Sequence, residues 1–196
     1  SIDSTFNMKK GRLFSLQDSH LLLVQQDTTS LSGITLRVED QFYPKLVHID
    51  DIIDALVYIT TRGEKQALLN ASSKKKALDK FWLQLSRTPQ RARSVIKLYF
   101  DRIEEANRYF TNYKQGWKTD QGMIYSVYGA PDIVNRYDDH EMWIYNKTDD
   151  LPKLTFKFIK VQNLLSDKHY SLIKDEEYEL YWHRAIDLLR KGRQNI

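Results

Sequence analysis

Two aspartates in one short segment are the side chains of this sequence best suited to acid–base chemistry. Asp120 and Asp132 could act as a general acid and a general base. The residues that could assist them are Tyr125, Tyr128 and Lys118. The same two carboxylates also suit cap and turn positions, where they accept hydrogen bonds from backbone N–H groups. We favour this structural interpretation, so we predict no catalytic residue and leave enzymatic activity open.

The residue types that bind metals or phosphate lack the spacing that such sites require. The 5 histidines show no HExxH-type pattern. They are His20, His48, His140, His169 and His183. The acidic run at 138–141 lacks the glycine and the spaced oxygen ligands of a calcium loop, so a solvated turn is favoured. With 7 glycines and no phosphate-binding loop or nucleophile elbow, the sequence predicts no metal and no cofactor.

Composition narrows the class of protein. The absence of cysteine excludes disulfides, thiolate catalysis and zinc ribbons. With 29% charged and 12% aromatic residues, the chain reads as globular and soluble. The longest apolar runs, at 21–24 and 52–59, fall short of the roughly 18 residues that cross a bilayer, so we predict no transmembrane segment. Because the chain opens at Ser1 without a leader pattern, we expect a leader or larger N-terminal region to have been removed.

Basic residues are concentrated in the middle of the chain. Residues 74–118 carry 12 basic and 4 acidic side chains, whereas both flanking regions carry an acidic excess. Such a segment could bind an anionic polymer or nucleic acid. We favour instead the solvated faces of amphipathic helices, and the Lys74-Lys75-Lys76 run fits this view. The aromatic residues of the segment lie on its apolar stripes, whereas stacking platforms for single strands should be exposed beside the cations.

The first third of the sequence reads as strands. Ile34, Leu36 and Val38 alternate with polar residues, the period of a strand with one buried face. A second apolar run lies at 21–26, and the intervening residues have the glycine and polar content of a hairpin connection. Short runs at 12–16 and 45–49 suggest further strands. We therefore predict that residues 1–60 form a β-rich region, the end of a larger β-sandwich-like part.

Helical signals begin at Thr61, which with Glu64 fits a capping box and predicts a short helix to about residue 71. A second helix follows with one apolar stripe at Leu78, Phe81, Trp82 and Leu85. The third and longest helix begins with Thr88 as cap and Pro89 as its first residue. Its apolar face consists of Ala92, Val95, Ile96, Tyr99, Ile103, Ala106 and Phe110.

The last third returns to strands and closes with a helix. Apolar residues alternate around Trp143 and Tyr145, across 154–158 and across 170–172, and turn residues separate the three runs. The simplest arrangement is an antiparallel three-stranded meander. A closing helix is indicated by acidic residues at 175–177, basic residues near its end and one apolar face.

The segment 116–132 carries the most specific pattern. It reads Gly116-Trp117-Lys118-Thr119-Asp120-Gln121-Gly122-Met123-Ile124-Tyr125 and continues with Tyr128-Gly129-Ala130-Pro131-Asp132. This pattern resembles the signature of the GWxTD domain family, and the resemblance extends over about residues 55–190. Two details depart from the family pattern: Ala130 stands where a second proline is common, and the connection at 163–168 lacks a frequent glycine.

The resemblance implies an address and an architecture. Members of this family are mostly predicted exported or envelope proteins of Bacteroidota and related bacteria, with β-rich regions ahead of the motif domain. They have no established biochemical role. The resemblance therefore implies an extracytoplasmic location, in the periplasm or associated with the outer membrane, and protein partners in the cell envelope. It implies no reaction.

The motif residues suit a structural corner between helices and sheet. Gly116 could take a backbone conformation closed to other residues, and Trp117 could bury its ring. Thr119 or Asp120 could cap a following helix turn, which Gly129 would end in the left-handed region and proline would prevent from continuing. The residues predicted to form this structural or binding site are Gly116, Trp117, Thr119, Asp120, Gly122, Tyr125, Gly129, Pro131 and Asp132.

The segment 121–128 is predicted as a short helix, although the β preference of Ile124, Tyr125, Val127 and Tyr128 leaves a strand open. Followed by the Gly-x-Pro-Asp turn and the Trp-x-Tyr strand, it is also similar to small outer-membrane assembly lipoproteins of the helix-plus-three-strand type. That likeness concerns the fold alone, and function does not follow from fold.

Together these patterns predict an α+β fold. We expect an N-terminal antiparallel β region at 1–60, and a domain at 61–196 in which amphipathic helices precede the three-stranded meander and the closing helix. The expected function is that of a non-enzymatic structural or protein-interaction module of a bacterial cell-envelope protein. One alternative is a hydrolase or carbohydrate-processing enzyme with its site near Asp120 and Asp132. The other is anionic-polymer or nucleic-acid binding through 74–118.

Overall fold

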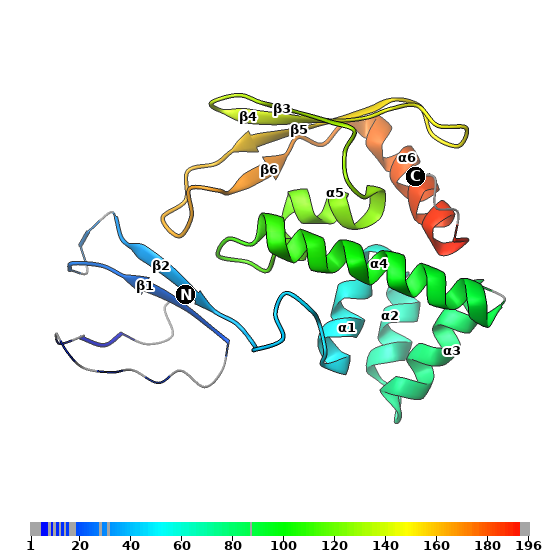
Figure 1. Cartoon of the computed structure of the whole chain (residues 1–196), viewed down its shortest axis with the longest axis horizontal. Coiled ribbons are helices and arrows are strands. Elements are labelled where there is room, and N and C mark those ends of the chain that lie inside the picture. Colours follow the sequence, from blue (N-terminus) through cyan, green and yellow to red (C-terminus); the bar gives the residue numbers. More distant parts are fainter. Residues whose placement is uncertain are drawn as a thin grey trace.

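The computed structural model confirms the α+β class (Figure 1). It describes residues 5–7, 9, 11, 13, 15, 19–27, 29–30, 32–86 and 88–192. The first elements in chain order are β1 (His20–Val24), β2 (Ile34–Val38), α1 (Ile49–Ala55), η1 (Leu56–Tyr58), α2 (Arg62–Leu69), α3 (Lys74–Ser86) and α4 (Pro89–Phe110). They are followed by η2 (Gly116–Lys118), α5 (Asp120–Tyr128), β3 (Ile133–Arg136), β4 (His140–Tyr145), β5 (Leu154–Lys160), β6 (Tyr170–Leu172) and α6 (Glu176–Arg190). Among the described residues, no helix combines the length and the apolar character needed to cross a bilayer.

The predicted N-terminal hairpin is present as a two-stranded sheet. β1 and β2 pair antiparallel, with Leu22 opposite Leu36. The strand predicted at 45–49 is wrong, because this segment leaves a turn and enters α1 at Ile49. Two acidic residues in the first turn of α1 favour the positive end of a helix dipole over a strand. The strand predicted at 12–16 falls largely outside the described residues.

Local capping fixes the starts of two central helices as predicted. The Thr61 hydroxyl accepts a hydrogen bond from the Glu64 N–H at 3.2 Å, and the Glu64 carboxylate accepts one from the Thr61 N–H at 2.7 Å. At the next start, the Thr88 hydroxyl accepts a bond from the Arg91 N–H at 3.3 Å ahead of Pro89. These bonds satisfy helix N–H groups that have no partner within the helix.

The long helix α4 runs through the centre of the molecule, with α1, α2 and α3 on one side of it and α5 on the other (Figure 1). Five of the seven residues of its predicted apolar face are buried, with Tyr99 and Ala106 at 0% exposure, and Ile96 and Phe110 are partly buried against the core. The Tyr99 hydroxyl donates to the backbone oxygen of Ala55 at 2.5 Å, which joins α4 to the end of α1. On the α3 side, Trp82 packs against Phe100 with ring centroids 6.4 Å apart.

The C-terminal sheet contains the three predicted strands and one more. Its order is β3-β4-β5-β6, all antiparallel, with Trp143 of β4 opposite Phe156 of β5. Helices α5 and α6 cover one face of this sheet (Figure 1), and alternate residues of β4 and β5 are buried beneath them. The added strand, β3, was missed because three of its four residues are exposed and show no buried-exposed alternation.

The closing helix α6 is joined to the start of the helical region. Arg190 donates to both carboxylate oxygens of Glu64, at 2.6 and 3.0 Å, and to the backbone oxygen of Ile59 at 2.7 Å. This hydrogen bonding to Arg190 lowers the pKa of Glu64 to about 2. The division of the chain at residue 60 stays a prediction.

Candidate functional site

The motif segment forms the corner where α4 gives way to the sheet (Figure 1). One turn of 3-10 helix, η2, is followed by Thr119 and then by α5, and α5 ends at Gly129 just ahead of β3. The predicted helix at 121–128 is therefore confirmed, with one residue more at its start. Seven of the nine residues of α5 are buried, so core packing offsets the β preference of its side chains.

Close backbone contact explains two glycines of the corner. A Cβ on Gly116 would lie 1.9 Å from the backbone oxygen of Ala106 in α4, and a Cβ on Gly122 would lie 1.9 Å from the backbone oxygen of Gly116. Neither residue has a positive φ. The prediction that Gly116 takes a conformation closed to other residues is therefore wrong. Both positions need glycine because a side chain has no room there.

Thr119 links η2 to α5. Its hydroxyl accepts a hydrogen bond from the Gly122 N–H at 3.0 Å and donates to the Gly116 backbone oxygen at 2.7 Å. The side chain is thus the N-cap of α5, as predicted for either Thr119 or Asp120, and at the same time it closes the preceding turn. Thr119 is 6% exposed and both bonds are buried, so they stabilise the corner with little competition from water.

Trp117 is buried at the centre of this corner, with 4% exposure. Its indole N–H donates to the Gln115 side chain at 3.1 Å, and its backbone oxygen accepts from the Tyr58 hydroxyl at 2.7 Å. The ammonium of the exposed Lys118 lies over the indole ring, 4.9 Å from its centroid. Burial raises the pKa of Tyr58, so its hydroxyl remains a donor at neutral pH.

The two candidate acid–base residues both bind backbone amides of the sheet region. The Asp120 carboxylate accepts a hydrogen bond from the Leu172 N–H in β6 at 2.7 Å. The Asp132 carboxylate accepts one from the Asn146 N–H, directly after β4, at 2.7 Å. The structure does not bring the two carboxylates together. Asp120 ties the start of α5 to β6, whereas Asp132, directly before β3, ties the start of that strand to the end of β4. Both amides lie farther along the chain than the local cap or turn expected from the sequence.

The end of α5 depends on Gly129 and on a buried arginine. Gly129 has φ 82° and ψ −158°, which side-chain-bearing residues rarely adopt, and its backbone oxygen accepts from the Tyr145 hydroxyl at 2.9 Å. The Arg102 guanidinium of α4 packs against Gly129 and donates to the Val127 backbone oxygen at 2.7 Å. Burial lowers the pKa of Arg102. Pro131 follows the turn and lies outside any helix, as predicted.

Tyr125 is the motif side chain that bonds to a carboxylate of α4. Its hydroxyl donates to the Glu105 carboxylate of α4 at 2.8 Å, while its ring packs against Phe110, with ring centroids 5.5 Å apart. Burial, assisted by that carboxylate, raises the pKa of Tyr125. A phenol held protonated in this way serves as a hydrogen-bond donor rather than as a base at neutral pH.

Two polar residues that support the corner were not singled out from the sequence. Asn107 is 1% exposed, accepts from the Trp117 N–H at 3.2 Å and donates to the Pro44 backbone oxygen at 2.9 Å. Glu141 is 9% exposed and accepts from the Gln121 side chain at 2.9 Å and from the Trp143 indole at 3.1 Å. A signal for Asn107 was available, because it lies four positions after Ile103 on the buried face of α4.

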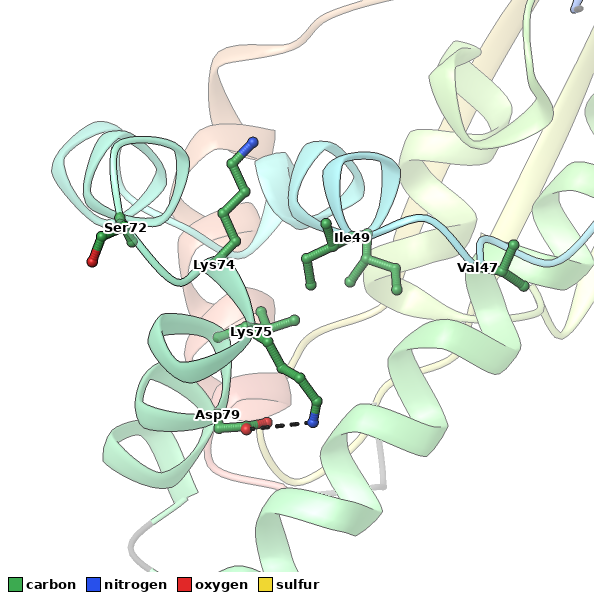
Figure 2. A pocket seen from close by; sticks show the side chains of 9 residues that line it. Val47, Ile49, Ser72, Lys74, Lys75 and Asp79 are labelled. Carbon is green, nitrogen blue, oxygen red and sulfur yellow. Dashed lines mark ion pairs between the residues drawn. The ribbon is translucent and has the colours of Figure 1, made fainter.

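Two grooves lie away from the motif. One, of about 650 Å³, lies between α1 and α3 (Figure 2). Its cations are compensated, since Lys74 pairs with Asp50 and Lys75 lies 4.0 Å from Asp79. The second, also about 650 Å³, lies between β2, the end of α4 and the β5–β6 connection. Neither groove is lined by a residue of the predicted motif site.

The geometry defines a class of α+β module in which a helix corner is bonded through backbone groups to an antiparallel sheet. A family model described as the GWxTD domain matches residues 20–191 of the 196, and the chain therefore belongs to the GWxTD domain family. The match begins well before residue 55, so it includes the hairpin and α1. Searches of curated proteins and of solved structures gave no match.

Proposed function

We propose that this chain is a structural or protein-interaction module of a bacterial cell-envelope protein and that it acts without catalysis. The observation that carries the proposal is that the polar side chains of the motif are hydrogen-bonded within the chain itself. The Asp120 and Asp132 carboxylates and the Thr119 hydroxyl all bind backbone groups of the same chain. Groups committed in this way are poorly placed to meet a substrate, and they support a rigid platform for other surfaces.

The positions of the aspartates argue against the hydrolase alternative. Asp120 begins α5 and Asp132 follows its end, and a helix of nine residues is about 13 Å long at about 1.5 Å per residue. Pairs of carboxylates that hydrolyse glycosidic bonds are roughly 5 to 10 Å apart and face the same bond. Here the two carboxylates face β6 and the end of β4 respectively.

The distribution of cations argues against the anionic-polymer alternative. Arg102 is buried in the protein interior. On the exposed side of α4, Lys97 pairs with Asp101 at 2.5 Å and Arg108 pairs with Glu104 at 2.6 Å. A binding surface for a polyanion needs many uncompensated cations on one face. Five of the twelve cations at 74–118 are thus buried or held in ion pairs, counting Lys74 and Lys75, which leaves fewer of them for a polyanion.

The envelope location in this proposal comes from membership of the GWxTD family, whose members are mostly predicted exported or envelope proteins of Bacteroidota and related bacteria. Protein partners in the periplasm or at the outer membrane are part of the same proposal. It is tested by capturing the full-length protein from its native envelope after cross-linking and by identifying the captured proteins by mass spectrometry. A bait of equal size and net charge is the control. A reproducible set of envelope proteins at fixed stoichiometry is expected, and recovery of cytoplasmic proteins alone would refute the proposal.

A pair of isosteric variants separates the platform from an enzyme. Asp120→Asn and Asp132→Asn keep the shape of the side chain but weaken a charge-assisted hydrogen bond, so each should destabilise the fold by about 1 to 3 kcal/mol. The enzyme alternative predicts unchanged melting together with lost hydrolysis of a glycan or ester substrate. Lys157→Gln, an exposed change on β5, is the control for removing a charge.

A further inference from the structure

The two edges of the C-terminal sheet differ in how their outward-facing backbone groups are bonded. At the β6 edge, the Asp120 carboxylate accepts the hydrogen bond of the outward-facing Leu172 N–H at 2.7 Å, and α5 packs beside the strand. At the opposite edge lies β3, which pairs with β4 and, within the described part of the chain, with no other strand. An uncovered edge strand presents backbone donors and acceptors that suit another strand. Among the described contacts, no side chain bonds to the outward backbone groups of β3 as Asp120 bonds to β6.

The register identifies the free backbone groups of β3. Ile133 lies opposite Ile144, and the Tyr137 N–H donates to the His140 oxygen at 2.9 Å. Because antiparallel strands alternate between bonded and non-bonded pairs, the backbone groups of Ile133, Asn135 and Tyr137 face β4. The N–H and C=O groups of Val134 and Arg136 therefore point away from the sheet. No hydrogen bond of the described residues engages them.

The side chains of this edge form a symmetric pattern around Asn135. On the face of the sheet opposite the helices, exposed Asn135 is flanked by Ile133, which is 47% exposed, and by Tyr137, which is 52% exposed. On the other face, Val134 packs at the edge of the core, and Arg136 pairs with the Glu141 carboxylate at 3.2 Å. The charge of Arg136 is therefore compensated within its own chain.

We propose that β3 pairs antiparallel with β3 of a second copy of this chain, on a two-fold axis through Asn135. In this register Val134 lies opposite Arg136 of the second copy, and the outward N–H and C=O groups of both residues are all bonded. Ile133 lies opposite Tyr137 of the second copy, so the two exposed apolar side chains of the edge cover each other. The two sheets become one continuous sheet across the axis.

A second copy fits this edge because the edge is complementary to itself. The pairing leaves no outward N–H of β3 unused and places no unpaired charge within the four residues of the strand. Just beyond the strand, Asp138 would lie opposite Asp132 of the second copy, and this like-charge pair weakens the contact. A strand this short buries less than the roughly 1,200 Å² of a stable interface, so the association is reversible and depends on concentration. The inference does not depend on the proposed function.

The absence of native cysteine allows a direct test with single-cysteine variants of the full chain. Asn135→Cys places the thiol at the axis, where two non-bonded partners have Cα atoms about 4.5 Å apart, within the range that a disulfide spans. Lys157→Cys is the control, because Lys157 is exposed on the same face but lies two strands from the edge. Under mild oxidation, Asn135→Cys should form covalent dimers at least tenfold faster than the control. Equal rates would overturn the proposal.

Sedimentation of the cysteine-free chain supplies a second measurement. The average mass should rise from monomer towards dimer as the concentration increases, and Asp138→Asn should shift this rise to lower concentration. Val134→Pro removes one outward N–H without removing a bond to β4, so it should keep the chain monomeric. Its melting curve shows whether the fold is intact, and Ile133→Lys is the substitute if it is not. A wild-type monomer at all concentrations up to about 1 mM would overturn the proposal and leave the edge to a strand of another protein.

Discussion

The contact between Gly122 and Gly116 offers the sharpest test of the corner. In Gly122→Ala the new Cβ would lie 1.9 Å from the Gly116 oxygen, 2.7 Å from its carbonyl carbon and 2.9 Å from the Trp117 Cα. All three atoms belong to the backbone, so no side chain can rotate away. An ordinary contact needs about 3.4 Å, so α5 and η2 must separate by about 1.5 Å, against close packing on every side.

The expected loss of stability follows from two opposing effects. Forcing a methyl group into a packed site costs about 1 to 3 kcal/mol or more, and restricting the unfolded chain by replacing glycine in a helix returns about 0.5 to 1 kcal/mol. Because the obstructing atoms are backbone, we expect the upper end of that cost and a net loss of about 2 kcal/mol or more. For a chain of this size, this corresponds to a fall in Tm of about 4 to 8 °C.

The matched control is Gly63→Ala in α2. A Cβ at Gly63 meets no atom within 4 Å, so this variant should keep or raise the stability by up to about 1 kcal/mol. Circular dichroism during heating, with urea titration at one temperature, measures both variants. If the Tm of Gly122→Ala equals or exceeds that of the wild type, as expected for Gly63→Ala, the close backbone contact does not constrain the corner and the reasoning is wrong.

Three further predictions concern two residues at the corner and the ion pair that joins α6 to α2. Trp117→Ala should destabilise the fold by about 3 to 5 kcal/mol in urea titration, whereas unchanged melting with lost binding would show that the indole serves a surface site. Arg102→Met should cost about 1 to 3 kcal/mol by leaving the Val127 oxygen unbonded, and tryptophan fluorescence during unfolding would detect it. Arg190 lowers the pKa of Glu64 to about 2, so the stability from this pair is present above about pH 4.5 and is lost as the pH falls towards 2. Because Glu64 is 31% exposed, the free energy of unfolding of Glu64→Gln should be only about 1 to 2 kcal/mol below that of the wild type at pH 7. Urea titrations at several pH values should show this difference shrinking as the pH falls from about 4.5 towards 2.

The elements that were predictable from the sequence carry their own local signals. Thr61 with Glu64, and Thr88 with Pro89, set the starts of helices through bonds within four residues, so the sequence alone was sufficient. α1 was missed because a short apolar run without a side-chain cap resembles a strand. β3 was missed because its strand character comes from pairing with β4 and not from a pattern within its own four residues.

The bonding partners at the site were harder to predict than the motif itself. Asp120 and Asp132 were expected to bind backbone amides, but the amides belong to β6 and to the end of β4, and only the folded sheet brings them close. Arg102 was missed because an arginine on an amphipathic helix is usually exposed. It is buried here because the Val127 oxygen and the space beside Gly129 receive its guanidinium.

The order of residues in the motif follows from the geometry of one backbone path. Gly116 comes first because the chain passes against α4 there, and Trp117 then fills the space that this close approach leaves beside Tyr58. Thr119 must follow at the third position after Gly116, because its hydroxyl bonds back to Gly116 across a single 3-10 turn. Asp120, as the first residue of α5, then reaches the edge of β6. Lys118 is the exposed residue of the five and the one that the family name leaves open, because a turn of this kind directs one side chain to solvent.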